Sequence, residues 1–121
     1  MRAIRRLVVV CASLLVLGVI VIAHARLQKS EPAAGASLAA APKQIQLWFS
    51  EKLDPSVSKI EVSGPSGKVE LGPAHTMGDT SLMAAIGTKL ADGAYTVSWQ
   101  TSGDDGHVVK GGFKFTVKAA H

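Results

Sequence analysis

The sequence contains four histidines, and one of them stands beside a carboxylate in a pattern that metal sites use. His107 follows Asp105 with one glycine between them, in the stretch SGDDGH (102–107). Residues two apart on an extended segment project to the same face, so the carboxylate and the imidazole could converge on one ion. Asp-Gly is also a common turn dipeptide, and a turn histidine is often merely solvated. Taken alone, the pattern leaves a metal-binding pair and an ordinary turn both open.

The N-terminal segment has the layout of a secretory signal peptide. Basic residues at positions 2, 5 and 6 precede the uncharged apolar run LVVVCASLLVLGVIVIA (7–23), and Val21-Ile22-Ala23 fits a cleavage site. We expect residues 1–23 to be removed and residues 24–121 to form the exported domain.

Two alternatives to this cleavage stay open. The apolar run lies at the lower length limit for a bilayer span, so an uncleaved signal anchor could tether the domain. The sequence Ala23-His24-Ala25 is a second small-residue site, and cleavage after Ala25 would make Arg26 the first residue.

Cleavage after Ala23 would make His24 the first residue of the domain, which changes its chemistry. A terminal histidine offers its α-amine and its imidazole, and these two nitrogens chelate one metal in a single ring. The free amine has an ordinary pKa of about 8, so a metal can displace its proton at neutral pH. With Asp105 and His107 the donor set is N,N,N,O, and tetragonal coordination of that kind suits Cu(II). The residues therefore predict a site for one Cu(II) ion.

Charge and cysteine content narrow the class of protein. The chain has 13 Lys and Arg against 9 Asp and Glu, but three of the arginines lie within residues 1–23. The exported domain is therefore about neutral and has no basic cluster, which gives no support for nucleic-acid binding. The single cysteine, Cys11, lies in the apolar run as ordinary apolar filler, so residues 24–121 contain no disulfide.

The exported part of the sequence is patterned as β-structure. Apolar and polar residues alternate in short segments that are bounded by Gly, Pro, Asp and Ser. These segments are 44–50, 59–63, 68–71, 81–86, 94–100 and 113–117. About seven short strands in one domain predict an all-β fold, a Greek-key β-sandwich or small barrel. Only residues 34–42 could form a turn of helix.

The aromatic residues of these segments are most simply assigned to the core. Aromatic side chains remove large apolar areas from water, and six of them lie within the alternating segments. They are Trp48, Phe49, Tyr95, Trp99, Phe113 and Phe115.

Two stretches of the sequence resemble the CopC-type periplasmic copper-binding proteins. Mature chains of that family begin His-x-x-Leu and Ser-x-Pro-x-x-Gly, then reach Ala-Pro and a strand that ends Phe-Ser-Glu. The corresponding residues here are His24, Leu27, Ser30, Pro32, Gly35, Ala41, Pro42, Phe49, Ser50 and Glu51. The stretch LADGAYTVSWQTSGDDGHVVKGGFKFTV (90–117) resembles the family's Leu-x-x-Gly-x-Tyr-x-Val-x-Trp strand, its Asp-x-His turn and its closing strand. The resemblance covers essentially all of residues 24–117.

The resemblance implies a cupredoxin-like, Ig-like β-barrel that binds copper in the periplasm. The family's Cu(II) ligands correspond to His24, through its amine and its ring, and to Asp105 and His107. The glutamate after Phe-Ser lies near that site in the family, so Glu51 is either an outer or weak ligand or a solvated strand end. The resemblance also implies a soluble, monomeric carrier in copper tolerance or supply, beside a CopD-type inner-membrane copper transporter.

The sequence departs from those family members that also bind Cu(I). They carry a methionine-rich loop with a histidine, because thioethers are the donors that Cu(I) prefers. Here only Met77 and Met83 lie beyond Met1, with His75 nearby. We interpret these methionines as apolar filling and predict no functional Cu(I) site.

Two other classes of function are alternatives to a copper carrier. Terminal-histidine copper also occurs in oxidative enzymes, which need an open coordination position and a broad face for a polymeric substrate. A carboxylate ligand and a domain of 98 residues argue against that class. A metal-free Ig-like structural or adhesion module would give His24 no special role. We expect a copper-binding protein and not an enzyme.

Overall fold

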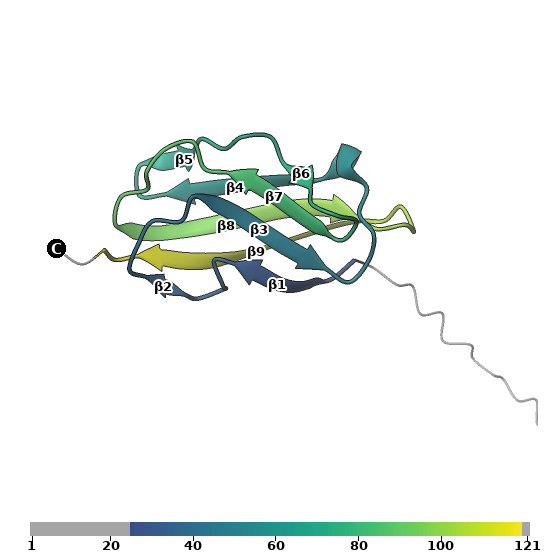
Figure 1. The fold of residues 1–121 in the computed structure, drawn as a ribbon, viewed down its shortest axis with the longest axis horizontal. Helices are drawn as coiled ribbons and strands as arrows, with labels where there is room; N and C mark the ends of the chain where they lie inside the picture. Colours follow the sequence, from purple (N-terminus) through teal and green to yellow (C-terminus); the bar gives the residue numbers. More distant parts are fainter. Residues whose placement is uncertain (1–24, 120–121) are drawn as a thin grey trace, which may run out of the picture.

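A computed structural model describes residues 25–119, which fold as two packed β-sheets (Figure 1). One sheet has the strand order β1-β3-β7-β6 and the other has the order β2-β9-β8-β4-β5. The strands are β1 (Leu27–Glu31), β2 (Ser37–Leu38), β3 (Gln44–Phe49), β4 (Lys59–Gly64), β5 (Gly67–Val69), β6 (His75–Thr76), β7 (Ser81–Ala85), β8 (Gly93–Ser102) and β9 (Val108–Val117). A 3₁₀ turn, η1 (Pro55–Val57), follows β3.

The predicted all-β class is confirmed, since each of the six alternating segments contains a strand. Residues 34–42 do not form the turn of helix that their sequence allowed. Part of that stretch forms β2, which pairs in parallel with the end of β9. The amide of Thr116 donates to the carbonyl of Ala36 at 2.9 Å, and the amide of Lys118 donates to that of Leu38 at 2.8 Å. The edge of β9 thus supplies hydrogen-bond partners that an isolated turn of helix would not have.

Residues 1–24 lie outside the described residues, and with them the expected signal peptide, Cys11 and His24. Between residues 25 and 119, no helix is long and apolar enough to cross a bilayer.

The core lies between the sheets and is built from alternate residues of facing strands. On β3 the inward set is Ile45, Leu47 and Phe49, all nearly inaccessible to solvent. Five of the six aromatic residues are buried in this core or packed against it. The assignment of Trp48 to the core is wrong, because strand alternation turns it to the outer face of the sheet. There the ammonium group of Lys29 lies 4.7 Å from the centre of its ring.

The long β8–β9 hairpin carries the residues singled out for metal binding. Its ladder is unbroken from Gly93 opposite Val117 to Ser102 opposite Val108. The turn at its tip, residues 103–107, lies at the same end of the sandwich as the start of β1 and the segment after β3 (Figure 1). Two well-ordered strands therefore hold this turn against the first described residues of the chain.

Phe115→Ala is expected to lower the free energy of unfolding by about 3–5 kcal/mol. Phe115 is 1 % exposed, and its ring stacks on Tyr95 with centroids 5.3 Å apart. The truncation would leave a cavity that the two sheets cannot close. Urea unfolding of both proteins measures the difference, with the exposed neighbour Lys114→Ala as the control. A loss below about 1 kcal/mol would contradict the assigned packing.

Candidate metal centre

The turn at residues 103–107 brings a carboxylate and an imidazole into contact. The amide of Gly106 donates to the carbonyl of Gly103 at 3.1 Å, and Gly106 has φ +76°, a conformation in which a side chain is strained. The amide of His107 donates to Oδ1 of Asp105 at 3.1 Å. Nδ1 of His107 lies 3.2 Å from Oδ2 of the same carboxylate. The sequence Asp-Gly-His thus folds locally into a pair of potential metal donors.

Both side chains of this pair are open to solvent to different degrees. The side chain of His107 is 58 % exposed and that of Asp105 is 21 % exposed. A pair at a hairpin tip contributes little to the core, so its side chains can exchange partners without disturbing the sheets. Chemically, this arrangement suits a site that takes up an ion from solution and gives it up again.

The first described residues of the chain pack directly against this turn. Ala25 is 3 % exposed and belongs to the core. A Cβ placed on Gly103 would lie 3.5 Å from Cβ of Ala25 and 3.6 Å from its nitrogen. The next residue is held by Ser50, since the amide of Arg26 donates to Oγ of Ser50 and the amide of Ser50 donates to the carbonyl of Arg26, both at 2.9 Å.

The carboxylate of Glu51 lies over the same turn. Its Oε1 would be 3.1 Å from a Cβ on Gly103, which is closer than ordinary packing allows. Glu51 is half-buried, so it is not a fully solvated strand end. Gly103 therefore marks the point where the start of the chain, the end of β3 and the hairpin turn come together.

The fourth expected contributor, His24, lies outside the described residues. Within residues 25–119, no three side chains of the His, Cys, Asp or Glu type are gathered closely enough to hold a metal. The described part of the chain supplies one imidazole and one carboxylate in contact, a second carboxylate against Gly103 of the same turn, and the adjoining residues Ala25 and Arg26. Together with further nitrogen donors, this set of nitrogen and oxygen ligands would suit a divalent first-row transition metal.

Comparison with known families identifies the family to which this chain belongs. The CopC domain family matches residues 27–118, which is most of the chain. The chain belongs to the CopC family.

Individual members of the CopC family show similarity over most of this chain. The Escherichia coli (strain K12) protein named Protein YobA is 36% identical over 99 residues, covering 79% of this chain and 80% of that protein. Copper resistance protein C of Xanthomonas campestris pv. juglandis is 35% identical, covering 79% of this chain and 81% of that protein. The crystal structure of PcoC, a methionine-rich copper resistance protein from Escherichia coli, superposes with a TM-score of 0.72 at 32% identity, covering 79% of this chain and all of that one.

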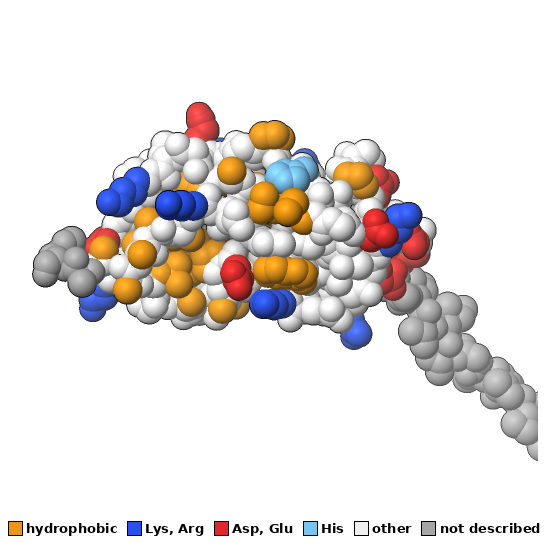
Figure 2. All heavy atoms as spheres, viewed as in Figure 1, with side chains coloured by type: hydrophobic (Ala, Val, Ile, Leu, Met, Phe, Trp, Pro, Cys, Tyr) orange, Lys and Arg blue, Asp and Glu red, His pale blue; other side chains and the backbone are white. Residues whose placement is uncertain are grey.

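In this CopC chain, three loops with acidic residues meet at the end that carries the turn. The amide of Leu53 donates to the carbonyl of Asp79 at 2.9 Å, and the amide of Asp54 donates to that of Ser102 at 3.0 Å. Charged side chains crowd this end of the molecule (Figure 2). The acidic residues of the three loops are Glu51, Asp54, Asp79, Asp104 and Asp105. Their charge favours the approach of cations to the turn.

The pKa of Asp54, at this end of the sandwich, is displaced in a defined direction. Hydrogen bonds from the hydroxyl and the amide of Ser56 lower the pKa of the Asp54 carboxyl below its ordinary value, because they stabilise the charged form. This contribution to stability is therefore present above the ordinary carboxyl pKa and is lost as the pH falls through the lowered value.

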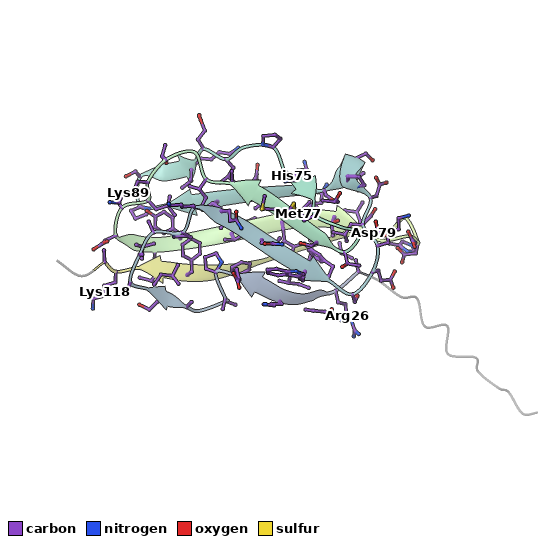
Figure 3. The ribbon with its side chains drawn as sticks, viewed as in Figure 1. Arg26, His75, Met77, Asp79, Lys89 and Lys118 are labelled. Atoms are coloured by element: carbon purple, nitrogen blue, oxygen red, sulfur yellow. The ribbon has the colours of Figure 1, made fainter. Side chains whose placement is uncertain are left out.

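The methionine and histidine pair of the second candidate site lies on the four-stranded sheet. His75 is directly opposite Met83 across the β6–β7 ladder, and Figure 3 shows His75 beside Met77 on the outer face. Met77 is 47 % exposed, so its interpretation as apolar filling is wrong. Alternation places Leu82 and Ala84 inward on β7, which leaves Met83 on the outer face with the other two side chains.

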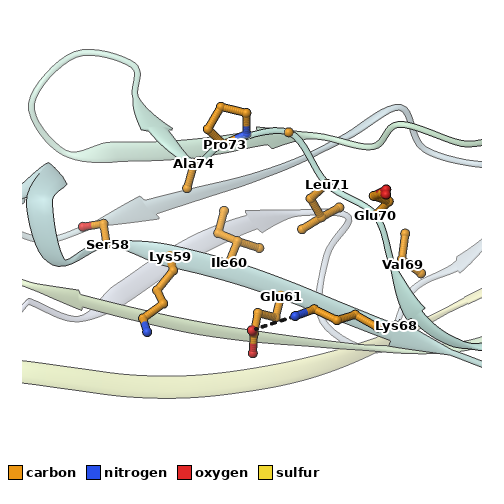
Figure 4. Close-up of a pocket in the computed structure, with 11 residues that line it drawn as sticks. Ser58, Lys59, Ile60, Glu61, Lys68, Val69, Glu70, Leu71, Pro73 and Ala74 are labelled. Atoms are coloured by element: carbon orange, nitrogen blue, oxygen red, sulfur yellow. Dashed lines mark hydrogen bonds and ion pairs between the residues drawn. The ribbon is translucent and has the colours of Figure 1, made fainter.

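A crevice of about 560 Å³ lies elsewhere, between β4 and residues 70–74 (Figure 4). Ile60 and Leu71 form its apolar part, and Lys68 at its rim makes a 3.3 Å ion pair with Glu61. Its described lining contains no histidine, cysteine or methionine, so it offers no donor that copper prefers.

Sequence reasoning did not assign a role to Ala25, Ser50 or Gly103. Ser50 belongs to the Phe-Ser-Glu segment and Gly103 to the SGDDGH stretch, so both residues lie inside motifs that resemble the CopC family. For Gly103 the available signal is its residue type, because a glycine permits the close approach of another chain segment. The identity of that segment depends on tertiary contacts, which alternation patterns do not encode.

Proposed function

We propose that this CopC-family protein is exported to the periplasm, binds one Cu(II) ion there, and sequesters or delivers it. In this proposal the donors are the α-amine and the imidazole of His24, the carboxylate of Asp105 and the imidazole of His107. Glu51 serves as an outer or weak ligand that orients the site. In this proposal the protein binds copper and passes it on, and the bound copper catalyses no reaction.

The burial of Ala25 against Gly103 is the observation that carries this proposal. Ala25 is the residue that would follow the terminal histidine after cleavage at Ala23, so its packing against Gly103 supports a terminal donor close to the turn. In this proposal, a histidine at the expected terminus and an Asp-x-His turn, two independent features of the sequence, serve one site at this end of the sandwich. A metal site explains why a histidine is found in both.

The contact between Ala25 and the core also supports cleavage after Ala23. Cleavage after Ala25 would remove a residue that is 3 % exposed and would leave Gly103 without its packing partner. The folded domain would then lose both the terminal donor and part of its core. Cleavage after Ala23 retains Ala25 and makes His24 the terminal residue.

A carrier role is favoured over catalysis by the setting of the pair. The Asp105–His107 pair lies at a solvent-exposed hairpin tip, and not in a cleft that would exclude water from a substrate. The relatives named copper resistance protein are consistent with copper tolerance. A CopD-type inner-membrane transporter is the proposed partner, since a metal held at an exposed tip can be passed on while both sheets stay intact.

The mature domain is expected to bind one Cu(II) tightly and Cu(I) weakly. One N/O donor set suits Cu(II), whereas two thioethers and one imidazole are fewer soft donors than a methionine-rich loop supplies. Competition titrations with chelators selective for each oxidation state measure both affinities. Met77→Leu combined with Met83→Leu is expected to leave Cu(II) binding unchanged. Tight Cu(I) binding that this double variant abolishes would overturn the expectation.

A further inference from the structure

We propose that Ser50 and Gly103 are positioning residues that hold the mature N-terminus at the copper site. This inference rests on the proposed function, because it concerns how the terminal donor of that site is fixed. Neither residue is a proposed ligand. Both act through Ala25 and Arg26, the two residues that follow His24, which we call the N-terminal arm.

Ser50 replaces a backbone partner at the point where β3 ends. In a regular antiparallel pair the two residues exchange two amide-to-carbonyl bonds. Arg26 and Ser50 form only one of these, from the Ser50 amide to the Arg26 carbonyl. The Arg26 amide instead donates to the Ser50 hydroxyl at 2.9 Å. The Ser50 hydroxyl thus adds one more hydrogen bond to the β1–β3 ladder. Because the Ser50 carbonyl is not the acceptor of that bond, the main chain can turn away from the ladder toward Glu51.

A bulge in β1 aims the arm at the hairpin turn. Leu27 is opposite Phe49, but Lys29 is opposite Trp48, so Gln28 is an extra residue in the ladder. A bulge of this kind bends the strand and increases its local twist. The Ser50 bonds lie on the terminal side of the bulge and fix the direction in which the arm leaves the sheet.

Gly103 provides the space into which the arm fits. Its backbone is not in the left-handed region, so a side chain there would cause no backbone strain. The restriction is one of room, because a Cβ would stand 3.1 Å from Oε1 of Glu51 and 3.5 Å from Cβ of Ala25. A methyl group would therefore shift the Glu51 carboxylate by a few tenths of an ångström and would fill the space beside Ala25 in ordinary contact with it.

The proposed consequence is an N-terminal arm whose direction is already set by Ala25 and Arg26 before copper arrives. Ligand groups that are held in place lose less conformational freedom when the metal binds, and affinity rises accordingly. Residues that orient metal ligands without touching the metal typically change affinity by about 10–100-fold. The arm contacts at Ser50 and Gly103 are predicted to fall in this range.

The test uses the mature domain and two pairs of variants. Ser50→Ala is expected to lower Cu(II) affinity by about tenfold, and Ser50→Thr, which keeps the hydroxyl, is expected to restore it. Gly103→Ala is expected to lower affinity severalfold, while Gly72→Ala is its control, because a Cβ on Gly72 meets only ordinary contacts at 3.7 Å or beyond. Affinities come from competition with a chelator, and thermal unfolding checks the fold.

A metal-free readout separates the positioning role from the copper site itself. Amide hydrogen exchange at Arg26 is expected to become faster in Ser50→Ala but not in Ser50→Thr, because only the first removes its acceptor. The electron paramagnetic resonance spectrum of Cu(II) in Ser50→Ala is expected to show a less uniform site than in the parent.

The possible outcomes distinguish the two levels of the proposal. If Ser50→Ala and Gly103→Ala bind Cu(II) as the parent does, while His107→Ala does not, the positioning role is overturned and the copper site stands. If parent binding does not depend on His107, the proposed site fails and the positioning role fails with it. Reduced affinity with rescue by threonine and faster Arg26 exchange supports the inference. Should Ser50→Ala unfold, Gly103→Ala against Gly72→Ala decides the question.

Discussion

His107→Ala is expected to lower Cu(II) affinity by at least about 100-fold while leaving the fold intact. Loss of a group that only orients a ligand costs about 10–100-fold, so loss of a direct nitrogen donor should cost at least the upper end of that range. The side chain of His107 is 58 % exposed at a hairpin tip and contributes little to the core. Asp105→Ala should weaken binding less, because a carboxylate is a donor that copper prefers less than an imidazole nitrogen.

His75→Ala is the matched control for this variant. It removes an exposed imidazole from β6, which belongs to the other sheet. Its Cu(II) affinity is expected to equal that of the parent, and all three proteins should unfold at the same temperature. Chelator competition gives the affinities and circular dichroism gives the unfolding curves. Equal Cu(II) binding by His107→Ala and the parent would leave the SGDDGH stretch as an ordinary turn.

The strands that carry the site could be predicted because their pattern is local. Tyr95, Val97 and Trp99 alternate with polar residues in β8, and such alternation reflects one buried face regardless of what covers it. The contact between Asp105 and His107 is equally local, since it depends on two residues and one glycine. The sequence therefore sufficed for the hairpin and for the half of the proposed site that the hairpin carries.

Other features depend on partners that are distant in sequence and escaped prediction. Residue type alone misassigned Trp48, which alternation along β3 turns outward, where it contacts Lys29 of the neighbouring strand β1. Met77 resembles a core residue by type, yet it is exposed because it lies at the sheet edge after β6. The space that Gly103 leaves for Ala25 joins residues about eighty positions apart, and no periodicity reports such a contact.

The second large effect is expected from a single glycine added before His24 of the mature domain. The addition converts the terminal amine into an amide, which at neutral pH is a far poorer donor and cannot close the same chelate ring. The imidazole remains, and the strands are unchanged because the extra residue precedes the buried Ala25. Affinity for Cu(II) should fall steeply and approach the loss in His24→Ala.

The central claim is that the mature N-terminal amine and the Asp105–His107 turn bind one Cu(II) together. Its most direct test is a Cu(II) competition titration of two proteins, the authentic domain that begins at His24 and the same domain with one glycine added. Mass spectrometry of both samples establishes the terminal residue. We expect the authentic protein to bind one Cu(II) tightly and the extended protein to show a steep loss of affinity. Equal affinities would eliminate the amine as a ligand and contradict the proposed site.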